Sequence, residues 1–208
     1  RSDRKLSAGN RLIFQMKCEE SIMLKETIEL KVDYEKAGVS SEGCKPVLDC
    51  YYSTLTEEIG RKKHRAMIIC PGGGYGWVSD REAEPIAMKF LGAGYHAVIL
   101  RYSVAPAAHY PTALRQLAWT VAHLREHAAE YHIDPNKVVV AGFSAGGHLA
   151  ASYGVFWKKK TFLAEELGVD AEQLRPNGLL LSYPVITSGP KAHRGSFTNL
   201  LGNRYDEL

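Results

Sequence analysis

The chain has 208 residues, and at about 150 residues per domain this length favours a single domain with one large core. Hydrophobic residues make up 45% and charged residues 24% of the sequence, which excludes a disordered tail, a collagen-like repeat and a coiled coil. The net charge is only +3, and the basic runs at 61–65 and 158–160 have no interleaved aromatic residues, so we expect no nucleic-acid partner.

No apolar stretch approaches the roughly 18 residues that a membrane span needs, so we expect no membrane partner. The four cysteines form neither a C-x-x-C pair nor a zinc spacing, which favours reduced thiols in the cytoplasm. Six of the eight histidines are scattered without a carboxylate or cysteine at ligand spacing, so we expect neither a metal nor another cofactor. The chain opens on Arg1 without a signal segment, which indicates an interior start or a processed end.

The predicted elements begin with strands. Residues 1–20 are polar and mixed, and we assign them no structure. From Thr27 apolar and polar residues alternate, which is the period of a half-buried strand. A second strand is predicted at 46–52, and it should pair antiparallel with the first. The next strand, 66–70, is short and wholly apolar, as expected of a strand buried on both faces.

Strands and helices then alternate. We predict a helix between Ser79 and Gly94, a strand at 97–102, a helix from Pro111 to Ala128, a strand at 137–141, a helix after it, a strand at 179–182 and a short helix at 197–202. Ser79-x-x-Glu82 resembles a capping box, but Pro85 would then fall past the first turn, so the first helix should start a little later. This alternation implies parallel strands with a ligand site at their carboxyl ends.

The strongest motif is Gly142-Phe143-Ser144-Ala145-Gly146, which follows the predicted strand 137–141 and opens a helix-compatible segment. This is a G-x-S-x-G nucleophile elbow. The turn is so tight that the serine takes a strained conformation, and only very small residues two positions away avoid collision. The following helix directs its positive dipole end at the serine. We therefore predict that Ser144 is a catalytic nucleophile.

A second motif, Pro71-Gly72-Gly73-Gly74-Tyr75-Gly76-Trp77, directly follows the strand 66–70. A backbone without side chains can turn its N–H groups toward a neighbouring strand end, as an oxyanion hole requires. The expected donors are the N–H groups of Ala145 and of Gly73 or Gly74. The loop lacks the lysine of a phosphate-binding loop and the order G-x-G-x-x-G, which excludes a nucleotide site.

These residues resemble the α/β-hydrolase fold, in the esterase branch that carries an HGGG-type loop, as in hormone-sensitive-lipase-like and acetylxylan-esterase-like enzymes. Residues 71–74 stand where that loop would, with Pro71 in place of the usual histidine, and 100–106 resemble the Y-R-L-A-P segment. Residues 142–147 match the elbow. Residues 192–196 with 199–202 are similar to the loop after the sixth strand in sugar-acetyl-esterase-like members.

The resemblance implies one domain over residues 1–208 with three layers, α/β/α, and a mostly parallel central sheet with an antiparallel N-terminal pair. It also implies a triad in the order Ser, Asp or Glu, His. After Ser144 the histidines are His148, one helical turn on and expected to be structural, and His193, expected to contact substrate or anchor a loop rather than act as base. We therefore expect the triad acid and base, and the last strands of the sheet, to be missing from this chain.

Two further strand-helix units would need on the order of 60 residues beyond Leu208. A sheet without its last strands exposes an apolar edge, which we expect the missing residues or a partner, such as a second copy in a homo-oligomer, to cover. Tyr75 and Trp77 beside the glycine loop are candidates for substrate binding, as a wall for a sugar ring or a floor for an acyl group, with structural packing as the competing interpretation. Tyr183 and Pro184, near the same rim, are expected to pack.

The sequence thus predicts a serine hydrolase of small esters, with a short acyl group, acetyl above all, carried on a carbohydrate and transferred through an acyl-enzyme on Ser144. The first alternative is a non-catalytic, ligand-binding hydrolase-like module, which the absent triad partners support. The second is an exopeptidase on the same fold.

Overall fold

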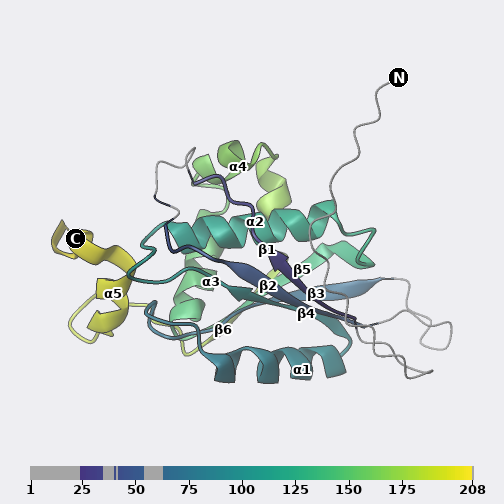
Figure 1. Ribbon diagram of the computed structural model, residues 1–208, viewed down its shortest axis with the longest axis horizontal. Helices are drawn as coiled ribbons and strands as arrows, with labels where there is room; N and C mark the ends of the chain where they lie inside the picture. Colours follow the sequence, from purple (N-terminus) through teal and green to yellow (C-terminus); the bar gives the residue numbers. More distant parts are fainter. Residues whose placement is uncertain (1–23, 35–39, 41, 54–62, 208) are drawn as a thin grey trace.

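The computed structural model describes residues 24–34, 40, 42–53 and 63–207, and its centre is a six-stranded sheet in the order β1-β2-β4-β3-β5-β6 (Figure 1). The strands are β1 (Leu24–Glu29), β2 (Val47–Tyr52), β3 (His64–Cys70), β4 (Tyr95–Arg101), β5 (Ile133–Phe143) and β6 (Gly178–Ser182). Strand β2 runs antiparallel to both of its neighbours, and the other pairs are parallel. The mostly parallel sheet with an antiparallel N-terminal pair is confirmed. Residues 1–20, to which we assigned no structure, lie outside the described residues.

Helices cover both faces of the sheet, so the predicted three layers are confirmed. Helix α1 (Glu84–Gly92) lies on one face, and α2 (Thr112–Glu126) and α3 (Ala145–Phe156) lie on the other (Figure 1). Successive side chains of a strand point to opposite faces. Accordingly Met67 and Ile69 of β3 pack in the cluster under α1, whereas Ile68 packs in the cluster under α2 and α3.

The helix boundaries follow local chemistry. Helix α1 starts at Glu84, later than a capping box at Ser79 would place it, and Pro85 stands in its first turn, where no intrahelical bond is lost. A short 3-10 helix, η1 (Asp80–Glu82), precedes it. Sequence periodicity missed α4 (Phe162–Leu167), because six residues carry too little of a helical pattern.

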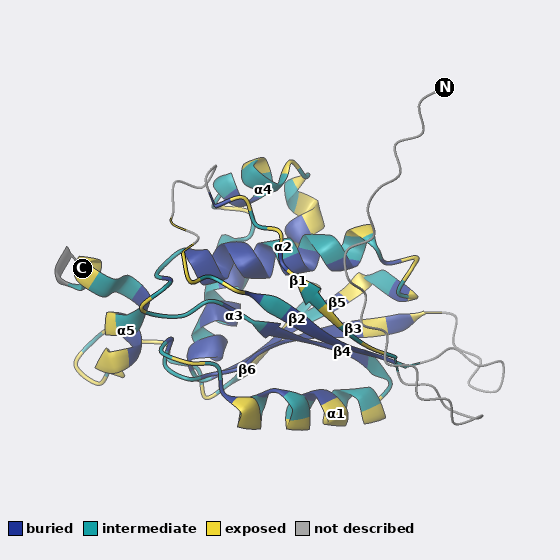
Figure 2. Cartoon of the chain, viewed as in Figure 1, coloured by how far each residue is buried: buried dark blue, intermediate teal, exposed yellow. Residues whose placement is uncertain are grey.

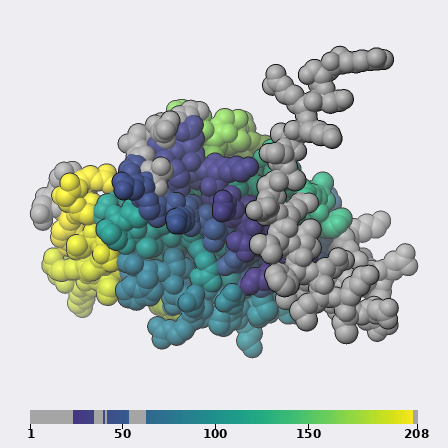
Figure 3. Space-filling model, in the orientation of Figure 1, coloured from purple at the N-terminus to yellow at the C-terminus, as the bar shows by residue number. Residues whose placement is uncertain are grey.

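The C-terminal part of the described chain forms η2 (Ala171–Leu174), α5 (Arg194–Leu201) and η3 (Gly202–Glu207). Helix α5 and η3, yellow in Figure 3, lie at one end of the molecule. Helix α5 is joined there to the segment after β4, because the Tyr110 N–H donates to the Leu200 carbonyl and His109 Nδ1 bonds to the Asn199 carbonyl.

Strand β6 is an edge of the sheet, as the sequence led us to expect. Its three leucines, Leu179, Leu180 and Leu181, are each about 40% exposed although they belong to an apolar strand. No helix in the described ranges is long and apolar enough to cross a membrane.

The core is deepest where α2 and α3 meet the sheet (Figure 2). Leu117, Val121 and Leu124 of α2 have no exposed surface, and they pack with Tyr153 of α3 in the larger apolar cluster. Burying one such leucine stabilises a fold by about 1.5–3 kcal/mol. The elbow between β5 and α3 therefore adjoins the larger of the two apolar clusters.

Two buried histidines lie at the amino ends of β3 and β4. His64 and His96 stack with ring centroids 4.3 Å apart. His96 Nδ1 accepts the Ser53 N–H and Nε2 donates to the Tyr131 carbonyl. Burial, and after it the neighbouring His64, lowers the pKa of His96 to about 4. The folded protein thus holds His96 neutral.

The substitution Leu117→Ala should lower the free energy of unfolding by about 2–5 kcal/mol, because it removes buried methyl groups and leaves a cavity. Urea unfolding followed by circular dichroism measures it. Met88→Ala on the outer side of α1, where Met88 is 39% exposed, serves as the control and should cost about 1 kcal/mol or less. Equal losses in the two variants would contradict the assignment of the core.

Acidification should destabilise the protein through His96. An unfolded histidine binds a proton below about pH 6.5, whereas folded His96 stays neutral down to about pH 4. Stability should therefore fall across this window, by as much as about 3 kcal/mol from this residue alone. His96→Gln keeps a donor and an acceptor without titrating, so its unfolding free energy should depend less steeply on pH. Identical pH profiles of the two proteins would refute this role.

Candidate active site

Ser144 stands at the junction of β5 and α3 with φ 52° and ψ −117°, a backbone conformation that L-residues rarely adopt. A Cβ on Gly142 would lie 2.2 Å from the Gly146 carbonyl oxygen, and a Cβ on Gly146 would lie 2.0 Å from the Cys70 carbonyl oxygen. Neither position has room for a side chain. The strand-turn-helix that the G-x-S-x-G motif requires is therefore present.

The backbone around Ser144 is held on two sides. Its N–H donates to the Ser182 carbonyl at the end of β6, and its carbonyl accepts the N–H groups of His148 and Val185, each at 3.1 Å. The side chain is partly buried. Its hydroxyl makes no hydrogen bond to the part of the chain that the structure describes.

The glycine loop after β3 lies directly against the elbow. A Cβ on Gly72 would lie 2.9 Å from Ser144 Cβ. The next three residues all have positive φ, at 121° for Gly73, 61° for Gly74 and 58° for Tyr75. Two of these three positions are glycine, the residue that adopts such angles at least cost.

Every carbonyl of this loop from Pro71 to Tyr75 has a donor. The donors are the Tyr102 hydroxyl (2.6 Å, to Pro71), the Ser79 N–H (3.0 Å, to Gly72), the Gly76 N–H (3.0 Å, to Gly73), Asn199 Nδ2 (2.9 Å, to Gly74) and the Ala105 N–H (2.9 Å, to Tyr75). The Gly72 N–H donates to Glu82 Oε2 at 2.7 Å. The loop is thereby fixed through its carbonyls.

The N–H groups of Gly73, Gly74 and Ala145 are left without a hydrogen-bond partner among the described residues. Those of Gly73 and Gly74 belong to the loop that touches Ser144, and that of Ala145 belongs to the first turn of α3, where N–H groups have no intrahelical acceptor. These are the three groups that the sequence predicts as oxyanion donors. Their catalytic role stays a prediction.

Trp77 and Tyr75, the two aromatic residues proposed for substrate binding, lie in different surroundings. The Trp77 side chain is 65% exposed. Tyr75 is only 3% exposed, and its hydroxyl shares a hydrogen bond of 2.8 Å with His148 Nδ1. This burial supports the competing packing interpretation of Tyr75, and contact of its ring with substrate stays a prediction.

His148 and His193 do not act on Ser144 in this arrangement. The ring of His148 bonds to Tyr75, and burial lowers the pKa of His148 below its ordinary value. His193 is exposed and caps α5, because its Nδ1 accepts the N–H of Ser196 and bonds to the Ser196 hydroxyl at 2.8 Å. Its ring carbon Cε1 would lie 4.0 Å from a Cβ on Gly74. His193 thus anchors a loop beside the glycine loop, and contact with substrate stays a prediction.

No group of three or more potential metal ligands occurs in the described part of the chain. Asp170, one of the two aspartates after Ser144, accepts the Glu172 N–H and caps η2. Sequence reasoning missed Glu82, Tyr102 and Asn199 as partners of the glycine loop. Tyr102 lies in the Y-R-L-A-P-like stretch and Asn199 in the segment similar to the loop after the sixth strand, but neither signal indicated a contact with the glycine loop.

Comparisons with known proteins support one family. Residues 48–176, more than half of the chain, match the BD-FAE family. Endo-1,4-beta-xylanase B of Butyrivibrio fibrisolvens is 37% identical over 150 residues, which cover 70% of this chain and 23% of that protein. Acetylxylan esterase of Xylanibacter ruminicola is 30% identical over 142 residues, which cover 66% of this chain and 26% of that protein.

Solved structures agree on the fold. MGS-M1, an α/β hydrolase enzyme from a Medee basin deep-sea metagenome library, is 35% identical with a TM-score of 0.64, covering 82% of this chain and 60% of that one. The acetyl ester-xyloside bifunctional hydrolase of Caldicellulosiruptor lactoaceticus is 29% identical with a TM-score of 0.69, covering 85% and 63%. The chain spans about a quarter of the length of those two curated relatives and about three fifths of these solved chains. This chain belongs to the BD-FAE family and has the α/β-hydrolase fold.

Proposed function

We propose that the whole protein is a serine esterase that removes a short acyl group, acetyl above all, from a carbohydrate. The observation that carries this proposal is the elbow: Ser144, in a strained turn, lies against a loop whose Gly73 and Gly74 N–H groups have no partner among the described residues. Relatives named acetylxylan esterase and acetyl ester-xyloside bifunctional hydrolase support the acetyl and carbohydrate parts.

The reaction has two steps, acylation of Ser144 and hydrolysis of the acyl-serine. Ser144 Oγ attacks the ester carbonyl carbon and gives its proton to a base, and the N–H groups of Gly73 or Gly74 and of Ala145 hold the resulting oxyanion. The intermediate collapses to an acyl-serine as the alcohol leaves with that proton. Water then attacks the acyl-serine, again losing a proton to the base, and the carboxylic acid departs while Ser144 regains its hydrogen.

The base must be a histidine oriented by a carboxylate if the mechanism follows the triad. No described histidine bonds to the Ser144 hydroxyl. We therefore place the base and its acid outside the described residues, next to the uncovered edge at β6. That strand ends beside the nucleophile, because the Ser182 carbonyl accepts the Ser144 N–H.

The alternative function is a non-catalytic, ligand-binding module, which would also have no base near Ser144. Nothing in the described residues favours an exopeptidase. A location in the cytoplasm and self-association stay predictions from the sequence.

The substitution Ser144→Ala should lower kcat for acetyl esters at least about a thousandfold, because the attacking oxygen is removed. Release of acetate by the whole protein measures it, and a fluorophosphonate should add once to the wild type and not to the variant. Ser188→Ala, in an exposed loop, is the matched control and should keep full activity. A wild type that neither hydrolyses esters nor accepts the phosphonate would favour the non-catalytic module.

Removal of the exposed indole in Trp77→Ala should raise KM for an acetylated xylo-oligosaccharide about three- to tenfold, because a stacking surface for the sugar is lost. KM for ethyl acetate should stay unchanged, since this ester has no ring to stack. Steady-state kinetics on both substrates separate the two effects. Equal changes for both esters would contradict a sugar-binding role of Trp77.

A further inference from the structure

The carboxylate of Glu82 lies between the glycine loop and the end of β6. Its Oε2 accepts the Gly72 N–H at 2.7 Å, and its Oε1 accepts the Tyr183 hydroxyl at 2.9 Å. A Cβ on Gly72 would lie 2.6 Å from Glu82 Oε2 and 2.9 Å from Ser144 Cβ. Glu82 and Ser144 thus pack against the same glycine.

The contact with Gly72 removes one N–H from the possible oxyanion donors and orients another. The peptide group between Gly72 and Gly73 is planar, so its carbonyl and its N–H point in opposite directions. The Ser79 N–H holds that carbonyl at 3.0 Å, and the Glu82 N–H in turn donates to the Ser79 carbonyl at 3.2 Å. The segment that carries Glu82 therefore fixes Gly72 through both its N–H and its carbonyl, and with it the direction of the Gly73 N–H.

The contact with Tyr183 joins the same carboxylate to the elbow. Tyr183 directly follows Ser182, whose carbonyl accepts the Ser144 N–H. The Tyr183 side chain is 64% exposed, so apolar burial alone does not fix the ring, and its hydroxyl is held by Glu82. One side chain thus spans the segment that supplies the donors and the segment that holds the nucleophile.

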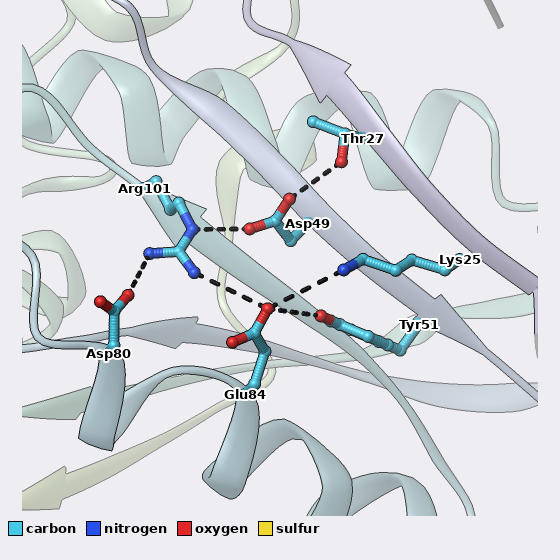
Figure 4. A network of polar contacts seen from close by, with 7 residues as sticks. All are labelled: Lys25, Thr27, Asp49, Tyr51, Asp80, Glu84 and Arg101. Carbon is cyan, nitrogen blue, oxygen red and sulfur yellow. Dashed lines mark hydrogen bonds and ion pairs between the residues drawn. The ribbon is translucent and has the colours of Figure 1, made fainter. Parts of the chain in front are cut away.

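Ion pairs on either side of Glu82 hold its segment to the sheet (Figure 4). Asp80 bonds to Arg101 at 2.9 Å, and Arg101 Nε donates to Asp49 of β2 at 2.6 Å. Glu84 accepts the hydroxyl of Tyr51, also on β2, at 3.1 Å. The segment that carries the Glu82 carboxylate is therefore anchored to the sheet through Asp80 on one side and Glu84 on the other.

We propose that Glu82 is a positioning residue for ester hydrolysis, which sets the position and direction of the Gly73 N–H group relative to Ser144. This inference rests on the proposed function. Because Glu82 acts through backbone groups that bind the oxyanion, its loss weakens binding of the transition state and leaves binding of the ester itself nearly unchanged.

Three variants of the whole protein test this role. Glu82→Leu removes both acceptors and should lower kcat about a hundredfold, as expected when an oxyanion donor is displaced, with KM within about threefold of wild type. Glu82→Gln keeps an acceptor for the Gly72 N–H and a polar partner for Tyr183, and should recover kcat to within about tenfold. Glu82→Asp keeps the charge but is one methylene too short, and should resemble Glu82→Leu.

The rate of fluorophosphonate labelling should fall in parallel with kcat across these variants, because the phosphonyl oxygen occupies the oxyanion position. Glu172→Leu is the matched control, since it removes an exposed carboxylate that pairs at 2.9 Å with Lys158, beyond the end of α3 opposite the elbow, and it should keep wild-type kinetics. Thermal unfolding identifies a variant that fails to fold. If Glu82→Leu fails to fold, the kcat of Glu82→Asp tests the inference in its place.

A folded Glu82→Leu or Glu82→Asp protein with kcat within about threefold of wild type would overturn the inference. So would a rise of KM with unchanged kcat, which would make Glu82 a substrate contact. A wild-type protein without esterase activity or phosphonate labelling would overturn the proposed function as well, so the two failures are distinguishable.

Discussion

Three backbone segments approach Ser144 so closely that only glycine fits between them. Gly146 packs on the carbonyls of Cys70 and Pro71, Gly142 packs on Gly146, and Gly72 packs on Ser144 itself. Each added Cβ would meet another atom at less than 3.0 Å. The end of β3, the end of β5 and the start of α3 are thereby brought to one point of the sheet.

This convergence stabilises a conformation that would otherwise be unfavourable. A residue with the φ and ψ of Ser144 costs on the order of 1–3 kcal/mol, and it persists because the elements on both sides are held. Strand β5 pairs with β3 and β6, and Leu149, Ala150 and Tyr153 of α3 are buried against the sheet and α2. The same geometry brings the N-terminus of α3, with its partial positive charge, to the nucleophile.

The elbow and the glycine loop could be predicted from the sequence because their chemistry is local. Tight turns need glycine at fixed offsets, and the strands before them are short apolar runs, so the positions of Ser144, Gly73 and Gly74 followed from spacing. The parallel strands followed from the alternation of strands and helices, and the three layers followed from the resemblance to the α/β-hydrolase fold. The boundaries shifted by a few residues where tertiary pairing extended a strand, as at the start of β5.

What sequence reasoning could not supply were contacts between residues far apart in the chain. The pattern Ser79-x-x-Glu82 is typical of a capping box. The Glu82 carboxylate instead bonds to Gly72, ten positions earlier, and to Tyr183, 101 positions later. Tyr75 is a candidate for substrate binding from its place beside the glycine loop, and in the fold its hydroxyl bonds to His148, 73 positions later. Such contacts depend on which distant side chains the fold brings together, and the spacing of residues along the sequence does not show this.

The most direct test of this account is a crystal structure of the whole protein after reaction with a fluorophosphonate. We expect one covalent bond, at Ser144 Oγ, and a phosphonyl oxygen within about 3 Å of the Ala145 nitrogen and of the Gly73 or Gly74 nitrogen. An adduct at another residue, or a phosphonyl oxygen turned away from the glycine loop, would contradict the assignment of the elbow and its donors.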